Sequence, residues 1–282
     1  MIDNAITVHA TPEVIKSHTV EPPSIYQRGE FIALGSTSFV ERLPNGDIIK
    51  TAWPEADRAA ERRREIALES EIYDILGQHP RIVMKKTWDP IHHTLTLEYM
   101  PNGTLKAYIE SNPHVSLSQR LQWIIQAAEG LALLHRLAII HCDVGPHNYL
   151  LDHRLDLKIA DFAGSSLNHS ATNSCPGERY TSPYLDGTWY QSPGPQVDMF
   201  ALGSTMYYIL TGNAPFAEFD SDGVKEKYMA HEFPDLSDIP CAEVIRGCWL
   251  QEFASAHEVV ELVKGTWSGS DGGCVVQQYH CS

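Results

Sequence analysis

The sequence predicts an α+β fold of two lobes, a small β-rich N-terminal lobe with one main helix and a larger, mostly helical C-terminal lobe. Short apolar runs rich in β-branched residues fill residues 28–100, whereas apolar residues recur at helical spacing through residues 101–265. The turn-forming segment Pro101-Asn102-Gly103 separates the two patterns. A chain of 282 residues with 43% hydrophobic residues is long enough to build both lobes around a shared cleft.

Three strands are expected at the start of the N-terminal lobe, near residues 30–34, 39–43 and 47–52. Asn45 and Gly46 lie between the second and third of these segments. Both residues tolerate a positive φ, so they predict a tight hairpin turn.

The main helix of the N-terminal lobe is expected over residues 54–76, where Ala, Glu and Arg predominate and apolar residues recur at helical spacing. Gly77 is expected to end it. Two further strands are predicted near residues 82–88 and 93–99, which completes a small sheet with one helix.

Helices are expected in the C-terminal lobe over residues 116–137, 197–210, 243–249 and 256–264. The second of these segments is almost wholly apolar, which indicates a buried helix. The lobe therefore has a helical core.

The two ends of the chain lack the pattern of packed elements. Residues 1–27 predict an N-terminal arm, and residues 266–282 predict an irregular C-terminal tail. Neither a signal peptide nor a membrane span is expected, because no basic and then apolar leader and no run of about 18 apolar residues occurs. A cytoplasmic or nuclear location is expected, since the six cysteines form no Cys-x-x-Cys pair and suit reduced thiols.

The net charge of −15 argues against general binding to nucleic acid or to an anionic membrane. The dense basic cluster Arg62-Arg63-Arg64 is expected to be a solvated helix face.

A polar loop between two apolar runs carries candidate chemistry. In IIHCDVGPHNYLL, residues 139–151, the spacing H-x-D-x-x-x-x-N is formed by His141, Asp143 and Asn148. An aspartate can act as a base and an asparagine carbonyl as a metal ligand, although both side chains can also bond their own loop. His141 is expected to be structural.

Four other polar residues lie in order along the chain: Lys50 in DIIK, Glu69 in LESEIY, Glu98 in LEYMPNGTL and Asp161 in DFAG. Each has an ordinary explanation by itself, because most strand lysines and helix glutamates lie at the surface. Their joint order with the H-x-D-x-x-x-x-N loop, over more than a hundred residues, is the stronger signal.

This ordered set resembles the signature of the eukaryotic protein kinase superfamily, in particular small fungal kinase-like proteins. The resemblance covers about residues 30–265 and includes VDMFALGSTMYYILTGNAPF and the later Cys248-Trp249. It implies the bilobal protein-kinase-like fold, ATP and Mg²⁺ as cofactors, and a protein substrate. We expect a monomer that phosphorylates Ser or Thr and has no nucleic-acid or membrane partner.

By this resemblance, Asp143 accepts the proton of the substrate hydroxyl. Lys50, held by Glu69, contacts the α- and β-phosphates. Asn148 and Asp161 hold Mg²⁺, which prefers hard oxygen ligands.

The resemblance also predicts the nucleotide pocket. Val40 and Ile48 form its roof, Leu150 forms its floor, and the backbone of Glu98 and Met100 bonds the adenine edge. Ile48 has the same strand parity as Lys50, so both side chains are expected to face the cleft. The expected nucleotide-binding residues are Gly35, Val40, Ile48, Lys50, Glu98, Met100 and Leu150.

Two departures from the family pattern concern the phosphates. Only Gly35 remains of the family's G-x-G-x-x-G loop, so weak ATP affinity is expected. Gly145 replaces a lysine that steadies the γ-phosphate in the family, which predicts slow transfer. Gly145→Lys is therefore expected to raise kcat.

A third departure is Cys142, which replaces an arginine that in the family often binds a phosphate on the activation segment. Activation by phosphorylation of this segment is therefore not expected, although Thr172, Ser174 and Thr181 are available.

The A-P-E region reads Ser182-Pro183-Tyr184, and the arginine that pairs with its glutamate is also missing, near Ala256. Losing both partners of a buried pair can be nearly neutral.

Three functions are compatible with these residues. The preferred hypothesis is an ATP-dependent protein kinase with a weakened phosphate-binding loop, because all five polar groups of the chemistry are present. A pseudokinase that acts as a binding scaffold is favoured by the missing glycines and by Gly145. A small-molecule phosphotransferase of the aminoglycoside-kinase type shares H-x-D-x-x-x-x-N, but DMFALGSTMYYILTG argues against it.

Overall fold

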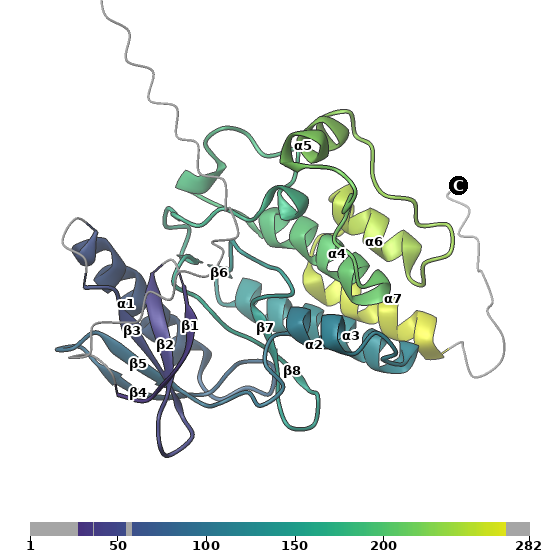
Figure 1. Ribbon diagram of the computed structural model, residues 1–282. Coiled ribbons are helices and arrows are strands. Elements are labelled where there is room, and N and C mark those ends of the chain that lie inside the picture. The colour runs from purple at the N-terminus through teal and green to yellow at the C-terminus, as the bar shows by residue number, and fades with distance from the viewer. Residues whose placement is uncertain (1–27, 36, 55–57, 269–282) are drawn as a thin grey trace, which may run out of the picture.

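The computed structural model describes residues 28–35, 37–54 and 58–268 and has the predicted bilobal α+β architecture (Figure 1). The fold-class prediction is thereby confirmed. The predicted N-terminal arm, Ser36 of the predicted phosphate-binding loop, residues 55–57 of the predicted main helix and residues 269–282 of the predicted tail lie outside the described residues.

The N-terminal lobe contains an antiparallel five-stranded sheet in the order β1-β2-β3-β5-β4. The hairpin between β2 and β3 turns where predicted. Gly46 has a φ of 91°, and its N–H donates to the Leu43 carbonyl at 2.8 Å. The strands are β1 (Glu30–Leu34), β2 (Ser38–Arg42), β3 (Ile48–Ala52), β4 (Lys85–Asp89) and β5 (Thr94–Leu97).

The predicted main helix is α1 (Ala59–Leu76), which packs against β3, β4 and β5. It begins at Ala59 instead of residue 54, because Arg58 has the non-helical φ of −124°. It ends as predicted at Gly77, where φ is 60° and the N–H donates to the Tyr73 carbonyl at 3.0 Å. The buried face of α1 carries Glu69 towards the sheet.

The C-terminal lobe is built on α3 (Leu117–Arg136) and α4 (Pro195–Thr211), which pack against each other. The apolar helix α4 is buried along most of its length, as its sequence indicated, and it also packs on α6 (Ala242–Trp249). The helix α7 (Ala256–Ser268) covers α3. It ends at Ser268, so the predicted boundary between lobe and tail at residue 265 falls inside a helix.

Two short helices were not predicted, α2 (Leu105–Ser111) and α5 (Ser221–Met229). Each buries only two side chains, so the apolar period is too short to stand out. Their N-caps were the available signal, because the side chains of Thr104 and Asp220 accept the N–H of the residue three positions on.

Two short strand pairs hold the ends of the polar loop 141–148. β6 (Ile139–Ile140) pairs with β9 (Ser166–Leu167), and β7 (Tyr149–Leu151) pairs with β8 (Leu157–Ile159). Strand pairing therefore holds the backbone of the loop at both ends, independently of its side-chain contacts.

The lobes are also joined by backbone hydrogen bonds beside β4. Ile82 lies parallel to Ile159 of β8. The Ile159 N–H donates to the Arg81 carbonyl at 2.8 Å, and the Val83 N–H donates to the Ile159 carbonyl at 3.2 Å. This bridge attaches the segment before β4 to the C-terminal lobe.

Within the described ranges, no helix combines the length and the apolar character needed to cross a membrane. The described cysteines Cys142, Cys175, Cys241 and Cys248 are all free thiols.

Gly203→Ala is predicted to destabilise the C-terminal lobe. A Cβ at Gly203 would lie 2.8 Å from the Cys248 Cβ and 3.1 Å from the Trp249 Cδ1, where α4 and α6 touch. Overpacking of this kind costs about 1–3 kcal/mol, which exceeds the gain in helix propensity of roughly 0.5–1 kcal/mol. Urea denaturation should show a lower free energy of unfolding.

Gly265→Ala in α7 is the matched control, because a Cβ there meets no described atom within 4 Å. It should leave stability unchanged or raise it. A Gly203→Ala protein as stable as the Gly265→Ala protein would contradict the close packing of α4 on α6.

Candidate active site

A cleft of about 790 Å³ lies between the lobes. All the residues that the sequence predicted for catalysis, metal binding and nucleotide binding line it, although they are spread over the chain from residue 35 to residue 161. The structure brings these eleven residues together: Gly35, Val40, Ile48, Lys50, Glu69, Glu98, Met100, Asp143, Asn148, Leu150 and Asp161.

Lys50 is the centre of a charged cluster that joins three elements. Its Nζ lies 2.8 and 2.7 Å from the two Glu69 carboxylate oxygens and 2.9 Å from Asp161 Oδ1. Lys50 and Glu69 are buried, and a buried charge needs such a partner because leaving water is costly. The sheet, α1 and the segment after β8 are thereby held together at the cleft.

Lys50 and Asp161 stabilise each other's charges, whereas burial raises the pKa of the Glu69 carboxyl above its ordinary value. Burial alone would lower the pKa of Lys50, but the Asp161 and Glu69 carboxylates outweigh it and raise this pKa above its usual range. Lys50 in turn holds the pKa of Asp161 below its ordinary value. Lys50 is therefore a cation and Asp161 an anion at neutral pH.

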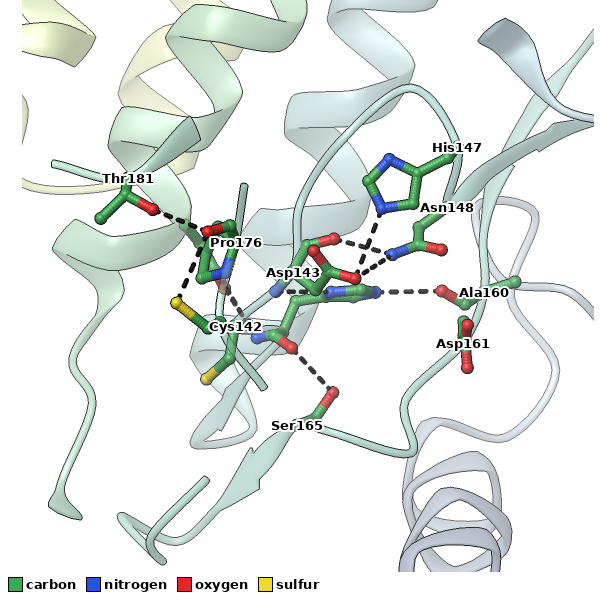
Figure 2. A network of polar contacts seen from close by, with 12 residues as sticks. Cys142, Asp143, His147, Asn148, Ala160, Asp161, Ser165, Pro176 and Thr181 are labelled. Carbon is green, nitrogen blue, oxygen red and sulfur yellow. Dashed lines mark hydrogen bonds and ion pairs between the residues drawn. The ribbon is translucent and has the colours of Figure 1, made fainter. Parts of the chain in front are cut away.

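The polar loop positions Asp143 through Asn148. The Asn148 Nδ2 donates to the Asp143 carbonyl at 2.8 Å and to Asp143 Oδ2 at 3.0 Å, as Figure 2 shows. His141 has the structural place that was expected. Its Nδ1 accepts the Asp143 N–H at 3.3 Å, so its Nε2 carries the proton that faces the Ala160 carbonyl at 3.0 Å.

Asp198, in the first turn of α4, is a residue that sequence reasoning missed. Its fully buried carboxylate accepts the backbone N–H groups of His141 at 2.8 Å and Cys142 at 2.9 Å. His135 of α3 lies 3.0 Å from the same carboxylate. The signal was present in the sequence, because a single acid in an almost wholly apolar helix requires buried donors.

Cys142 is buried in an apolar environment. It belongs to a small cluster with Ile140 and Val197, against which Leu185 and Trp189 pack. Burial raises the pKa of its thiol, and its backbone has a φ of 64°. The position that holds an arginine in the family is therefore filled here by an uncharged side chain among apolar neighbours.

Thr172, expected to be available for phosphorylation, is buried at 5% exposure. Its hydroxyl donates to the Gly164 carbonyl, and its N–H donates to the Tyr190 carbonyl at 2.9 Å. Ser174 and Thr181 are half-buried. Thr172 is thus a structural residue of the segment.

The A-P-E region is anchored by a contact that the sequence did not reveal. The Gln251 Nε2 donates to the Ser182 hydroxyl at 2.9 Å. Tyr184 lies at the surface, where its ring stacks on His231 at 5.1 Å between centroids, and Ala256 is buried. A neutral hydrogen bond thus attaches the segment to the turn after α6.

The loop between β1 and β2 closes on itself. The Gly35 N–H donates to the Ser38 carbonyl at 2.8 Å, and the Trp53 indole donates to the Gly35 carbonyl at 3.1 Å. Both backbone groups of Gly35 are therefore engaged within the protein.

At the linker between the lobes, the Glu98 carboxylate is engaged within the protein. It accepts the Met84 N–H at 2.8 Å and lies 2.5 Å from the Lys158 Nζ. Both contacts lie within the protein, so the carboxylate has partners without a ligand.

The donor set fits Mg²⁺. Asn148 uses its Nδ2 for Asp143, so its Oδ1 is the atom that can face a metal, and Asp161 adds a carboxylate. In the part of the chain that the structure describes, no three His, Cys, Asp or Glu residues form a metal cluster. Two oxygen ligands completed by phosphate and water suit Mg²⁺.

Comparison with known proteins agrees with this geometry. The probable serine/threonine-protein kinase KIN1 homolog of Encephalitozoon cuniculi is 27% identical over 212 residues, which is 72% of this chain and 36% of that protein. Serine/threonine-protein kinase SIK1 of Mus musculus is 25% identical over 206 residues, 70% of this chain and 26% of that protein. The carbon catabolite-derepressing protein kinase of Secale cereale is 29% identical over 175 residues, 61% of this chain and 34% of that protein.

The chain therefore spans about a third or less of the length of these curated relatives. Residues 44–267, more than half of the chain, match the protein kinase domain. The fold, the order of the cleft residues and this match lead to one conclusion: the chain belongs to the eukaryotic protein kinase superfamily.

Proposed function

We propose that the protein is an ATP-dependent protein kinase that phosphorylates Ser or Thr hydroxyl groups of a protein substrate, with Mg²⁺. The observation that carries this proposal is the single cleft that holds both the Lys50–Glu69–Asp161 cluster and the Asp143–Asn148 pair. The names of the relatives support Ser and Thr as acceptors.

ATP supplies the γ-phosphoryl group, whose phosphorus forms a bond to the substrate oxygen while its bond to the β-phosphate oxygen breaks and the electron pair leaves with ADP. Asp143 takes the proton of the substrate hydroxyl. Lys50 would neutralise charge on the phosphates, and Asn148 and Asp161 would hold the Mg²⁺, which supplies further charge neutralisation when bound. Phosphoryl transfer depends mainly on such positioning and charge neutralisation.

The phosphate-binding loop is weakened in this proposal. The Gly35 N–H is bonded to Ser38, so it is one backbone donor fewer for a phosphate. We infer modest ATP affinity and slow turnover. The same feature favours a second candidate, a pseudokinase that acts as a binding scaffold, and the transfer assay below distinguishes the two.

We also propose that activity does not depend on phosphorylation of the activation segment. Among the residues that the structure describes, the neighbours of Cys142 in its cluster are the apolar residues Ile140, Val197, Leu185 and Trp189, and Thr172 is buried. The Ser182–Gln251 hydrogen bond supplies an attachment of the segment that needs no added charge.

The purified protein is expected to bind Mg²⁺-ATP and to transfer phosphate slowly. Millimolar ATP should raise Tm, because a ligand that binds only the native state stabilises it. Lys50→Met should reduce this shift, and Asp161→Ala should remove its Mg²⁺ dependence. Asp143→Asn should keep the shift and lower transfer to a generic protein substrate by about 10²–10⁴-fold.

Three results would count against this proposal. If ATP changes the Tm of neither the wild-type protein nor the Lys50→Met variant, the protein is a scaffold that binds no nucleotide. A clear Tm shift without transfer indicates a nucleotide-binding pseudokinase. Transfer to aminoglycosides in preference to proteins indicates a small-molecule phosphotransferase.

Phosphatase treatment is expected to leave the transfer rate unchanged. The rate should be measured before and after treatment, with mass spectrometry to verify that Ser174 and Thr181 are unmodified. A large drop in the transfer rate would show that a cationic side chain elsewhere in the protein binds a phosphorylated residue and that activity depends on this contact.

Cys142→Arg, which restores the family's residue, is predicted to lower the free energy of unfolding by about 1–3 kcal/mol more than the control below. The much larger side chain would have to enter the packed cluster of Ile140, Val197 and Trp189, and overpacking costs about 1–3 kcal/mol. Cys142→Ala is the control, with a cost of about 1 kcal/mol. Equal stability of the two variants in urea denaturation would contradict the apolar character of this site.

A further inference from the structure

The space beside Gly145 is occupied by the imidazole of His147. A Cβ built on Gly145 would lie 2.5 Å from the His147 Cε1 and 2.8 Å from its Nδ1. Both distances are shorter than van der Waals contact, so any side chain at residue 145 must displace the ring. Gly145 is therefore more than a missing lysine, because it provides the room in which the ring lies.

The backbone around the ring is fixed. Asn148 donates its N–H to the Gly145 carbonyl at 3.0 Å, which closes a tight turn. Lys106 of α2 donates its N–H to the Pro146 carbonyl at 2.9 Å, and proline restricts the backbone further. His147 thus starts from a defined position at the floor of the cleft.

The ring points at the catalytic end of the cleft. The His147 Nε2 lies 3.4 Å from Asp143 Oδ2, the same oxygen that accepts the Asn148 amide (Figure 2). His147 lines the cleft together with Asp143 and Asp161, and its side chain is 47% exposed, so a ligand can reach it. An imidazole of either protonation state carries an N–H donor.

We propose that His147 is a catalytic residue that replaces the missing lysine, with its imidazole N–H bound to the γ-phosphoryl group beside Asp143. The inference rests on the proposed kinase function. His147 donates a hydrogen bond and keeps its proton, while the substrate proton goes to Asp143. A histidine bonded only to Asp143 is the ordinary alternative, and it predicts no preference for a nucleotide with a γ-phosphate.

Nucleotide binding tests the contact without any turnover. Isothermal titration calorimetry on the full chain should compare Mg²⁺-ADP with a non-hydrolysable Mg²⁺-ATP analogue. His147→Ala should weaken binding of the analogue roughly tenfold or more, as expected for a hydrogen bond to a charged group, and leave ADP unchanged.

Gly145→Ala is the sharper variant, because it leaves the imidazole chemistry intact and only displaces the ring. It should weaken the analogue to a similar extent and leave ADP unchanged. In a protein that already carries His147→Ala, the additional change Gly145→Ala should not weaken binding of the analogue further, since both changes remove the same contact. Gly265→Ala, far from the cleft, is the matched control for replacement of a glycine.

Kinetics provide the second readout. His147→Ala should lower kcat by about 10²-fold with the KM for the protein substrate unchanged, as for loss of one donor to transition-state charge. Gly145→Lys alone should not raise kcat, which revises the expectation from the sequence, because the ring fills its space. Gly145→Lys in the His147→Ala protein should restore kcat.

The outcomes separate the two proposals. An unchanged ratio of analogue to ADP affinity in both His147→Ala and Gly145→Ala would overturn the role of His147. A wild-type protein that prefers the analogue, loses this preference in both variants and transfers nothing would support His147 and overturn only the kinase activity. A wild-type protein that binds neither nucleotide would overturn both.

Discussion

The buried carboxylate of Asp198 is the interaction on which the active-site loop depends. It lies on the almost wholly apolar helix α4 and accepts the N–H groups of His141 and Cys142 while it contacts His135. A carboxylate without such donors would be costly in this interior, so the loop and the helix stabilise each other. The loop that carries Asp143 is therefore attached to the core of the C-terminal lobe.

Contacts of this kind also hold two residues of the site in a left-handed backbone conformation. Cys142 has a φ of 64° and Asp161 a φ of 67°, in the left-handed region that costs a non-glycine residue about 1–2 kcal/mol. The Asp198 carboxylate holds the first of these residues, and Lys50 holds the second. Strain of this kind persists where surrounding contacts over-determine the conformation, and two of the eleven described non-glycine residues with a positive φ, Cys142 and Asp161, lie at the site.

Much of the architecture could be predicted from the sequence, because a long amphipathic or apolar segment shows enough repeats of its hydrophobic period to indicate a helix or a strand. The short helices α2 and α5 were not predicted, because each buries only two side chains and so shows no clear hydrophobic period. The cleft residues could be placed because their order along the chain is distinctive, whereas their roles stay predictions. His147 and Gln251 were missed for a different reason. Each lies in a turn, where no strand or helix period indicates the direction of a side chain, so tertiary packing decides it.

The backbone bridge between Ile82 and Ile159 connects the two lobes at a second place besides the linker, and the Glu98–Lys158 ion pair reinforces the linker itself. A single covalent connection would leave one lobe free to swivel about it, whereas a second attachment restricts that rotation. The relative orientation of the cleft residues that come from the two lobes is therefore constrained by backbone pairing as well as by the linker peptide.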